Sequence, residues 1–316
     1  RVSVRVADVR VLCEQLVVSS VQQFFFLMIR RPPRSTLFPY TTLFLSLKDV
    51  KDTDRYKVMP RSATHTARYL TAADGMGFSL HVNRGEAIPP TQLWYKNHWE
   101  ANYLIGGVIK VTDMTSGQEW VLESGDLYQV GPNDRHLYEV LEDEHHLSIF
   151  CPSLRGDETH DEDGAYSASG PVPVTEQRMF VRHIEQMREA GREMLVANGQ
   201  ARVVRALTKS DGLGFSFSDV NFAAGATTKL WYKHHWETNY IISGTGQVED
   251  LTTGESWKLE PDMTYNVGPK DRHQLSAETD LHLASVFCPP LEGTEQHDSD
   301  GALEPSGPVP PGPPGY

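Results

Sequence analysis

An internal duplication constrains the fold of this chain more than any other feature of its sequence. The segment TQLWYKNHWEANY at residues 91–103 returns as TKLWYKHHWETNY at residues 228–240. The same offset relates ADGMGFS (73–79) to SDGLGFS (210–216) and HDEDGA (160–165) to HDSDGA (297–302). Each copy runs for about a hundred residues, which is much longer than the units of solenoid proteins. The chain therefore contains one domain twice.

The residue pattern inside each copy predicts β-strands. NYIISGTGQVEDLTTGESWKL (239–259) alternates apolar and polar residues around two turn signals, and LHLASVFCPP (281–290) is an alternating strand that ends at proline. Short strands at this spacing predict an all-β fold, with a sandwich or a small barrel in each copy. VRHIEQMREAGREMLVANG (181–199) is the segment that the pattern predicts to be a helix.

The composition excludes some classes of partner. Apolar residues make up 39% and charged residues 22% of the 316 residues, which is typical of a globular protein. The formal net charge of −13 argues against nucleic acid, whose phosphates bind clustered Lys and Arg. The apolar passage at residues 16–29 is too short and too interrupted to span a bilayer. Three cysteines without disulfide or metal-site spacing indicate a reducing cytoplasm.

The beginning of the chain does not read as part of the fold. Residues 24–46 include FFFLMIRRPPRSTLFPYTTLF, which resembles a translated sequencing adapter behind a poly-T run. A Pro/Arg-rich arm for an acidic partner is the alternative. We set this segment aside, as one would an expression scar. The expected organisation is a non-native or disordered leader (1–46), a first domain (47–170), a linker (171–178), a second domain (179–305) and a disordered Pro-rich tail (306–316).

Three repeated elements carry side chains that can bind a metal ion. They are H-W-E, a tyrosine in a predicted strand, and D-R-H. Residues two apart on a strand share a face, so we expect His98 and Glu100 to point into one cavity. Tyr128 and His136 flank the turn GPNDR and can both aim inward. A carboxylate, a phenolate and an imidazole suit iron better than a thiolate-preferring metal.

Simpler explanations exist for the same residues. A single buried His or Tyr is more often a hydrogen-bonded core group than a metal ligand, and duplication alone preserves residues at a fixed offset. Cys151 and Cys288 end F-C-P strands and read as small core residues. The Trp-Tyr pairs that begin at Trp94 and Trp231 fit packing or a pocket wall, and HDEDG fits a solvated turn.

The motifs taken together resemble those of the ectoine synthase family. G-M-G-F-S, Y-K-N-H-x-E-A, G-D-L-Y, D-R-H and F-C-P-x-L-x-G-x-E-x-H-D-E-D-G follow the family in order and spacing. The T-D-R at residues 53–55 matches its opening. The resemblance covers residues 47–166 and again 179–303. It implies two tandem cupin domains, small β-barrels of the jelly-roll type, which form a bicupin.

The resemblance also implies a cofactor and its ligands. Members of the family hold ferrous iron, Fe(2+), with the Glu, Tyr and His of these motifs. The implied metal ligands are Glu100, Tyr128 and His136 in the first copy and Glu237, Tyr265 and His273 in the second. Because family members are usually homodimers of single domains, the two copies are expected to pack as an intramolecular pseudo-dimer, and further pairing of the whole chain stays open.

The family reaction removes water from N-γ-acetyl-L-2,4-diaminobutyrate and closes a ring to give the osmolyte ectoine. The resemblance thus implies a carbon–oxygen hydro-lyase with a small-molecule substrate. The implied catalytic positions are Tyr95, His98, Glu158, Tyr232, His235 and Glu295. The implied substrate-binding positions are Phe150, Phe287, Arg68 and Arg205.

Departures from the family pattern concentrate in the substrate pocket. A pocket Trp of the family falls at Thr64 and Ala201, and a substrate-contacting Thr falls at Asn83 and Val220. Two other functions therefore stay open. One is a related iron cupin that acts on another small polar molecule as a dehydratase, isomerase or oxygenase. The other is a non-catalytic cupin that binds a small ligand or a metal.

Overall fold

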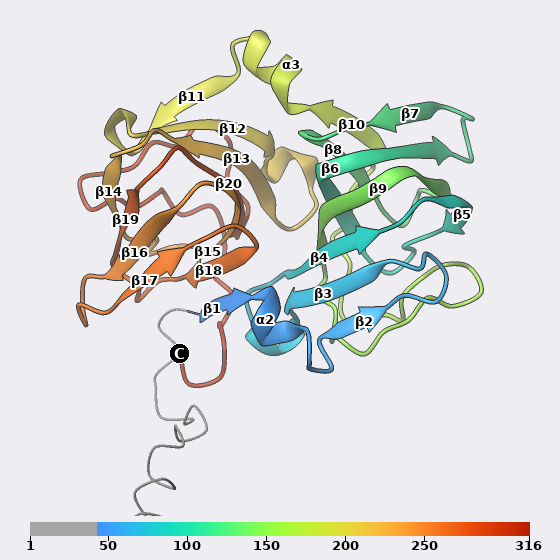
Figure 1. Ribbon diagram of the computed structural model, residues 1–316, viewed down its shortest axis with the longest axis horizontal. Coiled ribbons are helices and arrows are strands. Elements are labelled where there is room, and N and C mark those ends of the chain that lie inside the picture. The colour runs from blue at the N-terminus through green and yellow to red at the C-terminus, as the bar shows by residue number, and fades with distance from the viewer. Residues whose placement is uncertain (1–42) are drawn as a thin grey trace, which may run out of the picture. The chain divides into compact units, whose positions relative to one another are not determined.

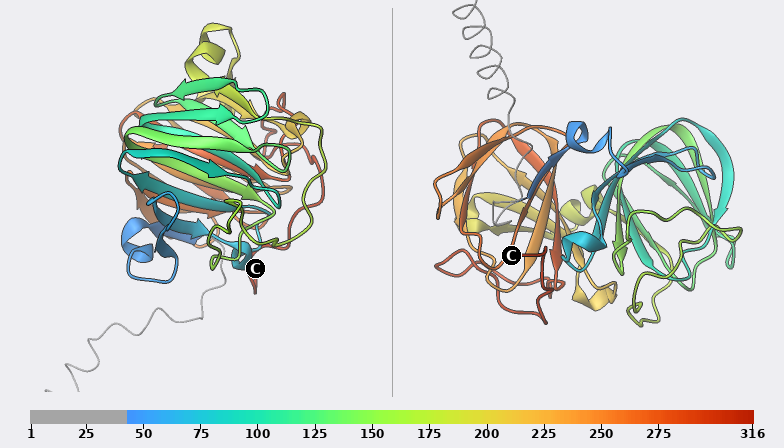
Figure 2. Two further views of the ribbon diagram at one scale, coloured as in Figure 1. Left: turned by 90° about the vertical axis from the view of Figure 1, so that its right-hand side faces the viewer. Right: turned by 90° about the horizontal axis from the view of Figure 1, so that it is seen from below.

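A computed structural model describes residues 43–316, and almost all of its regular structure is β-strand (Figure 1). This confirms the expected all-β fold with a duplicated domain. Each copy forms a small barrel, and Figure 2 (right) shows the strands of each copy wrapping into a closed curve. The adapter-like residues up to 42 lie outside the described part of the chain.

The first barrel is built on a nine-stranded sheet. Its strands follow the order β10-β8-β6-β9-β4-β3-β2, with β5 paired to β9 and β7 to β6, and β10 (Phe180–His183) comes from the second copy. The strands of the first copy are β2 (Tyr56–Val58), β3 (His65–Leu70), β4 (Ser79–Gly85), β5 (Ile88–Leu93), β6 (Trp99–Asp113), β7 (Glu119–Leu122), β8 (Asp126–Val130) and β9 (His136–Cys151). A short 3-10 turn, η1 (Ala72–Asp74), precedes β4.

The second barrel divides its strands between two sheets. One has the order β1-β18-β15-β20-β13-β12-β11 and the other the order β14-β19-β16-β17. The strands of the second copy are β11 (Glu193–Val196), β12 (Ala201–Leu207), β13 (Ser216–Phe222), β14 (Thr227–Leu230), β15 (Trp236–Ser243), β16 (Gly246–Asp250), β17 (Ser256–Leu259), β18 (Met263–Val267), β19 (His273–Ala277) and β20 (Leu281–Cys288). The 3-10 turns η2 (Ala197–Gly199) and η3 (Lys209–Asp211) precede β12 and β13.

The two barrels exchange their first strands. β1 (Leu43–Ser46), which begins the first copy, pairs antiparallel with β18 of the second barrel. β10 (Phe180–His183), its counterpart in the second copy, pairs antiparallel with β8 of the first barrel. Each exchanged strand covers what would otherwise be an open sheet edge with unpaired backbone groups. Leu43–Ser46, which the sequence places in the leader, thus forms a strand of the fold.

The helix predicted at residues 181–199 forms only in part. The segment begins within β10, continues as the six-residue helix α3 (Ile184–Glu189), passes through β11 and ends in the 3-10 turn η2. Its counterpart in the first copy, α2 (Leu47–Val50), has four residues. Because β10 and β11 obtain backbone hydrogen bonds from β8 and β12, tertiary pairing overrides the local helix propensity of this segment.

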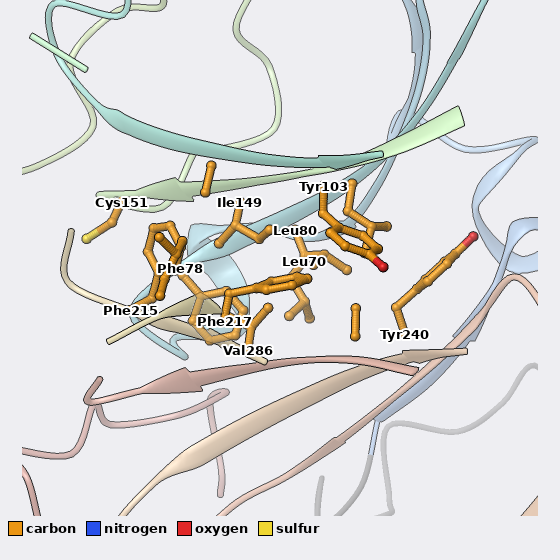
Figure 3. Packing of buried hydrophobic residues seen from close by; sticks show 14 of the residues in the cluster. Leu70, Phe78, Leu80, Tyr103, Ile149, Cys151, Phe215, Phe217, Tyr240 and Val286 are labelled. Carbon is orange, nitrogen blue, oxygen red and sulfur yellow. The ribbon is translucent and has the colours of Figure 1, made fainter. Parts of the chain in front are cut away.

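Alternate residues of the barrel strands face two different interiors. On β4, Leu80 and Val82 enter a hydrophobic cluster shared by both copies, whereas His81 and Asn83 line the interior of the first barrel. Figure 3 shows this shared cluster, in which Leu80 and Ile149 of the first copy pack near Phe217 and Val286 of the second. The two-residue period of a strand thus assigns one face to the contact between the barrels and the other to a cavity.

The segments that follow the barrels are held without regular secondary structure. The indole Nε1 of Trp99 donates to the carbonyl of Pro173 (2.8 Å), and that of Trp236 donates to Pro310 (3.0 Å). In the tail, which the sequence predicts to be disordered, the ring of Tyr316 also packs at a tilt against Trp236, with ring centroids 4.4 Å apart. Proline-rich backbone retains its carbonyl acceptors, so it packs here through indole donors and ring contacts.

Candidate active site

Each barrel holds a cavity, and the two are similar in size at about 40 Å³. Eight wall positions carry the same residue type in both. They are Leu93, Tyr95, Glu100, Asn102, Tyr128, Ser148, Phe150 and His160, with counterparts Leu230, Tyr232, Glu237, Asn239, Tyr265, Ser285, Phe287 and His297. These shared positions include the Glu and Tyr of each predicted metal site.

Two neighbouring strands place the predicted Glu and Tyr on one wall. In the first barrel Asn102 of β6 lies opposite Tyr128 of β8, and Glu100 shares the cavity face of Asn102 two residues away. Burial raises the pKa of Glu100 to about 7 and that of Glu237 to about 8. It also raises the pKa of both phenols, with the nearby carboxylate as the second cause. A bound cation would offset the burial of these anions.

The predicted histidines are the first residues of β9 and β19, next to the aromatic wall. The ring of His136 lies 6.1 Å from that of Tyr95, and the ring of His273 lies 6.2 Å from that of Tyr265. Nδ1 of His136 is 3.5 Å from the carbonyl oxygen of Asp134, and Nδ1 of His273 is 3.3 Å from that of Asp271. Burial lowers the pKa of both imidazoles to about 4, so the rings are neutral at pH 7.

These imidazoles fit metal ligands. A backbone carbonyl only accepts, so the proton sits on Nδ1 and Nε2 keeps a lone pair. Nε2 of both rings is buried without a hydrogen-bond partner in the structure, as is Oε2 of Glu237. A ring held at Nδ1 by a carbonyl, with Nε2 free, is a common arrangement of metal-binding His. No three His, Cys, Asp or Glu side chains group as a metal site among residues 43–316, but the predicted sets include a tyrosine.

His98 and His235 lie outside the cavity walls. β6 begins at Trp99, so His98 belongs to the preceding turn and does not share the strand face of Glu100, contrary to the expectation from spacing. Its ring meets Phe150 edge-on at 6.2 Å, and its Nε2 is 2.9 Å from the hydroxyl of Ser169. His235 repeats both contacts, with Phe287 at 6.2 Å and Ser306 at 3.0 Å. Both imidazoles therefore support an aromatic wall residue from behind.

Glu158 and Glu295 each bind the backbone of their own loop. The carboxylate of Glu158 accepts from the backbone N–H of Arg155 (2.7 Å) and Gly156 (2.8 Å). In the second barrel Arg205 lines the cavity and donates to the Glu295 carboxylate at 2.7 Å. In the first, Arg68 instead donates to the backbone carbonyls of Gly156 and Glu158. The structure therefore joins Arg205 to Glu295 and leaves the Glu158 carboxylate in its loop.

Sequence reasoning missed His160 and His297. Both rings line their cavities, with Nε2 3.1 Å from the Tyr95 hydroxyl and 3.2 Å from the Tyr232 hydroxyl. The acidic part of the motif is a turn, as expected, because the Asp161 carboxylate accepts from the backbone N–H of Asp163 and Ala165. The signal available in the sequence was the recurrence of His as the first residue of H-D-x-D-G-A.

Solved structures of similar fold define the class of this protein. It is similar to the Ylba protein of Escherichia coli, with a TM-score of 0.58 and 12% identity over 81% of this chain and 94% of that one. It is also similar to oxalate decarboxylase of Lactobacillus farciminis, with a TM-score of 0.56 and 13% identity over 79% and 87% of the two chains. With two barrels fused in one chain, the protein is a bicupin.

The sequence places it within one family. The family model described as Ectoine synthase matches residues 43–170 and again residues 179–306, so the chain belongs to the ectoine synthase family. L-ectoine synthase of Shouchella clausii (strain KSM-K16) is 42% identical over 34% of this chain and 80% of that protein. L-ectoine synthase of Teredinibacter turnerae (strain ATCC 39867 / T7901) is 36% identical over 40% of this chain and 96% of that protein. Each relative thus corresponds to about one barrel. No helix among the described residues is long and apolar enough to cross a membrane.

Proposed function

We propose that the chain is a metal-dependent hydro-lyase that converts N-γ-acetyl-L-2,4-diaminobutyrate into ectoine and water. The observation that carries this proposal is the buried Glu–Tyr wall in each barrel, next to a His whose Nε2 is free. In the reaction the α-amine nitrogen bonds to the acetyl carbonyl carbon. The acetyl oxygen leaves as water with both hydrogens of the amine. Nothing is oxidised or reduced.

The residues present would hold a divalent metal, which we propose to be ferrous iron. The donors would be Glu100, Tyr128 and His136 in the first barrel and Glu237, Tyr265 and His273 in the second. The metal would polarise the acetyl oxygen as a Lewis acid. A fold neighbour, oxalate decarboxylase of Bacillus subtilis, is described with Mn(II) centres, which makes manganese the metal to compare with iron.

The protein's own contribution would be confinement and proton transfer. An aromatic wall of Tyr95, Phe150 and Tyr166, with rings 5.4–5.7 Å apart, would favour a folded substrate. Burial lowers the pKa of His160 to about 4, so its ring is neutral. Nε2 of this ring can take a proton through the Tyr95 hydroxyl, 3.1 Å away. Tyr232 and His297 would act alike in the second barrel.

The remaining predicted residues have supporting roles in this proposal. His98 and His235 position Phe150 and Phe287 through their edge-on ring contacts. Glu158 and Glu295 hold the loops that close the cavities, and Arg68 and Arg205 tie these loops to the barrel. We further propose that the two barrels act as the halves of a pseudo-dimer, and that the protein works in the cytoplasm on a small molecule.

Ectoine formation by the purified chain tests the proposal. The protein is loaded anaerobically with ferrous iron and incubated with N-γ-acetyl-2,4-diaminobutyrate, and ectoine is measured by chromatography. Glu100→Ala and Glu237→Ala should each lower the rate, and the double variant should abolish it. If the protein bound iron but formed no ectoine, the proposed substrate would be wrong. This result would favour a related cupin enzyme with another small polar substrate, which the altered pocket residues Asn83 and Val220 also favour. If the protein bound no iron and formed no ectoine, the proposal of a metalloenzyme would be contradicted.

A further inference from the structure

The two cavities have opposite chemistry on one part of their walls. Seven wall positions are polar in the first barrel, and six of their counterparts are apolar in the second. The pairs are Thr64 and Ala201, Thr66 and Val203, His81 and Ser218, Asn83 and Val220, Tyr138 and Leu275, His146 and Leu283, and Tyr166 and Leu303. The shared Glu–Tyr wall is thus combined with a different second wall in each barrel.

In the first barrel the second wall is a connected hydrogen-bond network. The Thr66 hydroxyl donates to Oδ1 of Asn83 (2.8 Å), and Nδ2 of Asn83 donates to the Ser148 hydroxyl (2.9 Å). Nδ2 of Asn83 is also 3.1 Å from Nε2 of His146. His81, from the same wall, is 1% exposed, and its Nε2 has no partner in the structure. An unpaired buried nitrogen on a cavity wall favours a ligand that hydrogen-bonds there.

A buried carboxylate–imidazole pair stands behind this network. Nδ1 of His146 lies 2.9 Å from Oε2 of Glu144, which also accepts from the Tyr138 hydroxyl. Glu144 has its space because Gly85 lies opposite, where a Cβ would come within 2.9 Å of the Glu144 carboxylate. The corresponding pair in the second barrel is Phe222 opposite Leu281. The pair Gly85 and Glu144 thus leaves room for a polar group in the first barrel, whereas the pair Phe222 and Leu281 is apolar in the second.

In the second barrel the same wall is mainly aliphatic, with Ser218 as its polar counterpart of His81. Val203, Val220 and Leu283 line the cavity where the first barrel carries the network. Arg205, the charged group on that side, is paired with the Glu295 carboxylate at 2.7 Å. A polar ligand group on this wall would give up its hydrogen bonds to water without replacement, whereas an alkyl chain would gain from burial.

We propose that the two barrels select different ligands. The first takes a small molecule that is polar throughout. The second takes an N-acyl amino acid whose acyl chain is longer than acetyl, with its polar end at Glu237 and Tyr265 and its chain on Val203, Val220 and Leu283. This inference rests on the proposed function only in taking the Glu–Tyr wall to face the polar end of the ligand.

Calorimetric titration of the full, iron-loaded chain with two probes tests this selection. The probes are N-γ-acetyl- and N-γ-butanoyl-2,4-diaminobutyrate, which differ by two methylene groups. Burial of two methylenes corresponds to about a tenfold gain in affinity. We expect the butanoyl probe to bind the second barrel about tenfold more tightly than the acetyl probe, and to bind the first barrel no more tightly.

Reciprocal variants assign the binding to a barrel. Val220→Asn with Leu283→His gives the second barrel the polar residues of the first and should weaken butanoyl binding about tenfold. The matched variant Asn83→Val with His146→Leu should leave butanoyl binding in the second barrel unchanged. Val203→Thr replaces a methyl by a hydroxyl of similar size and should weaken butanoyl binding in the second barrel severalfold. This variant keeps the test valid if the double variant does not fold. Thr66→Val is its matched control.

The outcomes separate this inference from the proposed function. Equal affinity of the butanoyl probe for both barrels, or butanoyl binding that neither Val203→Thr nor the double variant changes, would overturn it. Ectoine formed from the acetyl probe without any butanoyl preference would leave the proposed function standing and reject the inference. Butanoyl binding that depends on Val203 and Val220, without ectoine formation, would support the inference and reject the function. Binding of neither probe would reject both.

Discussion

At the scale of single residues, the orientation of two imidazoles leads to a prediction about metal content. Because Nε2 of His136 and of His273 is buried and unpaired, we expect His136→Ala to lower the bound iron from about two ions to about one per chain. The double variant with His273→Ala should bind none. Metal analysis of the anaerobically loaded protein measures this. His98→Ala is the control and should keep both ions, because Nε2 of His98 already has the Ser169 hydroxyl as its partner. Unchanged iron in the double variant would contradict the assignment.

A second prediction concerns the cost of burying Glu237 without a metal. Burial raises its pKa to about 8 from an ordinary 4.5. The stability that the protonated carboxyl provides is fully present below pH 4.5 and is lost as the pH rises to about 8. Glu237→Gln keeps a neutral group, so it should be more stable than the metal-free wild type at pH 9, by a few kcal/mol, and nearly equal at pH 4.5.

Denaturant unfolding of the metal-free proteins between pH 4.5 and 9 measures this difference. The free energies of unfolding of the two proteins should diverge with rising pH. Glu260→Gln, at an exposed position, is the control and should follow the wild type at every pH. Parallel curves for Glu237→Gln and the wild type would show that the folded protein solvates the Glu237 carboxylate.

The residues of the site differ in how far the sequence could predict them. Glu100 and Tyr128 face the cavity, as expected, because strand periodicity fixes the direction of a side chain once the strand is known. This rule does not apply to His98, because β6 begins one residue later, at Trp99. His160 lies in a loop, where no period applies, so only the three-dimensional path of the chain could bring its ring to Tyr95. The roles of all these residues stay predictions.

At the scale of elements, the exchanged strand β1 leads to a prediction about stability. Phe44 stacks on Trp257 at 4.6 Å and lies 6.2 Å from Tyr265, so this strand of the first copy packs in the second barrel. Phe44→Ala should lower the free energy of unfolding by about 1–3 kcal/mol, measured by chemical denaturation. Lys48→Ala, an exposed position on α2, should change it little. If Phe44→Ala left the free energy of unfolding unchanged, residues 43–46 would not contribute to the fold and would belong to the leader.

The exchange also marks the limit of sequence reasoning about elements. Alternating patterns predicted strands within each copy, because one face of each such strand is buried and the other is not, whatever its partner. β1 and β10 pair with strands of the other copy, and no local pattern records a distant partner. Residues 181–199 show the consequence, since this segment with a helix-like sequence forms a strand, one short helix, a second strand and a 3-10 turn.

At the scale of the whole molecule, the shared cluster between the barrels predicts cooperative unfolding. Phe217 is fully buried there and meets the ring of Tyr103 from the other copy at 5.0 Å. A barrel that unfolded alone would expose this cluster and release one exchanged strand from its partner. We therefore expect one calorimetric transition for residues 43–316, with equal calorimetric and van't Hoff enthalpies. Phe217→Ala should shift the whole transition, with a loss of about 3–5 kcal/mol.

A matched variant in one barrel decides whether the halves are coupled. Leu275 is buried in the separate core of the second barrel, so Leu275→Ala tests a residue that touches only one half. If the barrels share one folding unit, Leu275→Ala shifts the same single transition, by about 2–5 kcal/mol. If they fold independently, the scan shows two transitions and Leu275→Ala moves one of them. Coupled unfolding would mean that a destabilising change in either cavity wall lowers the free energy of unfolding of both barrels. Two barrels with different cavity walls would then share a single stability.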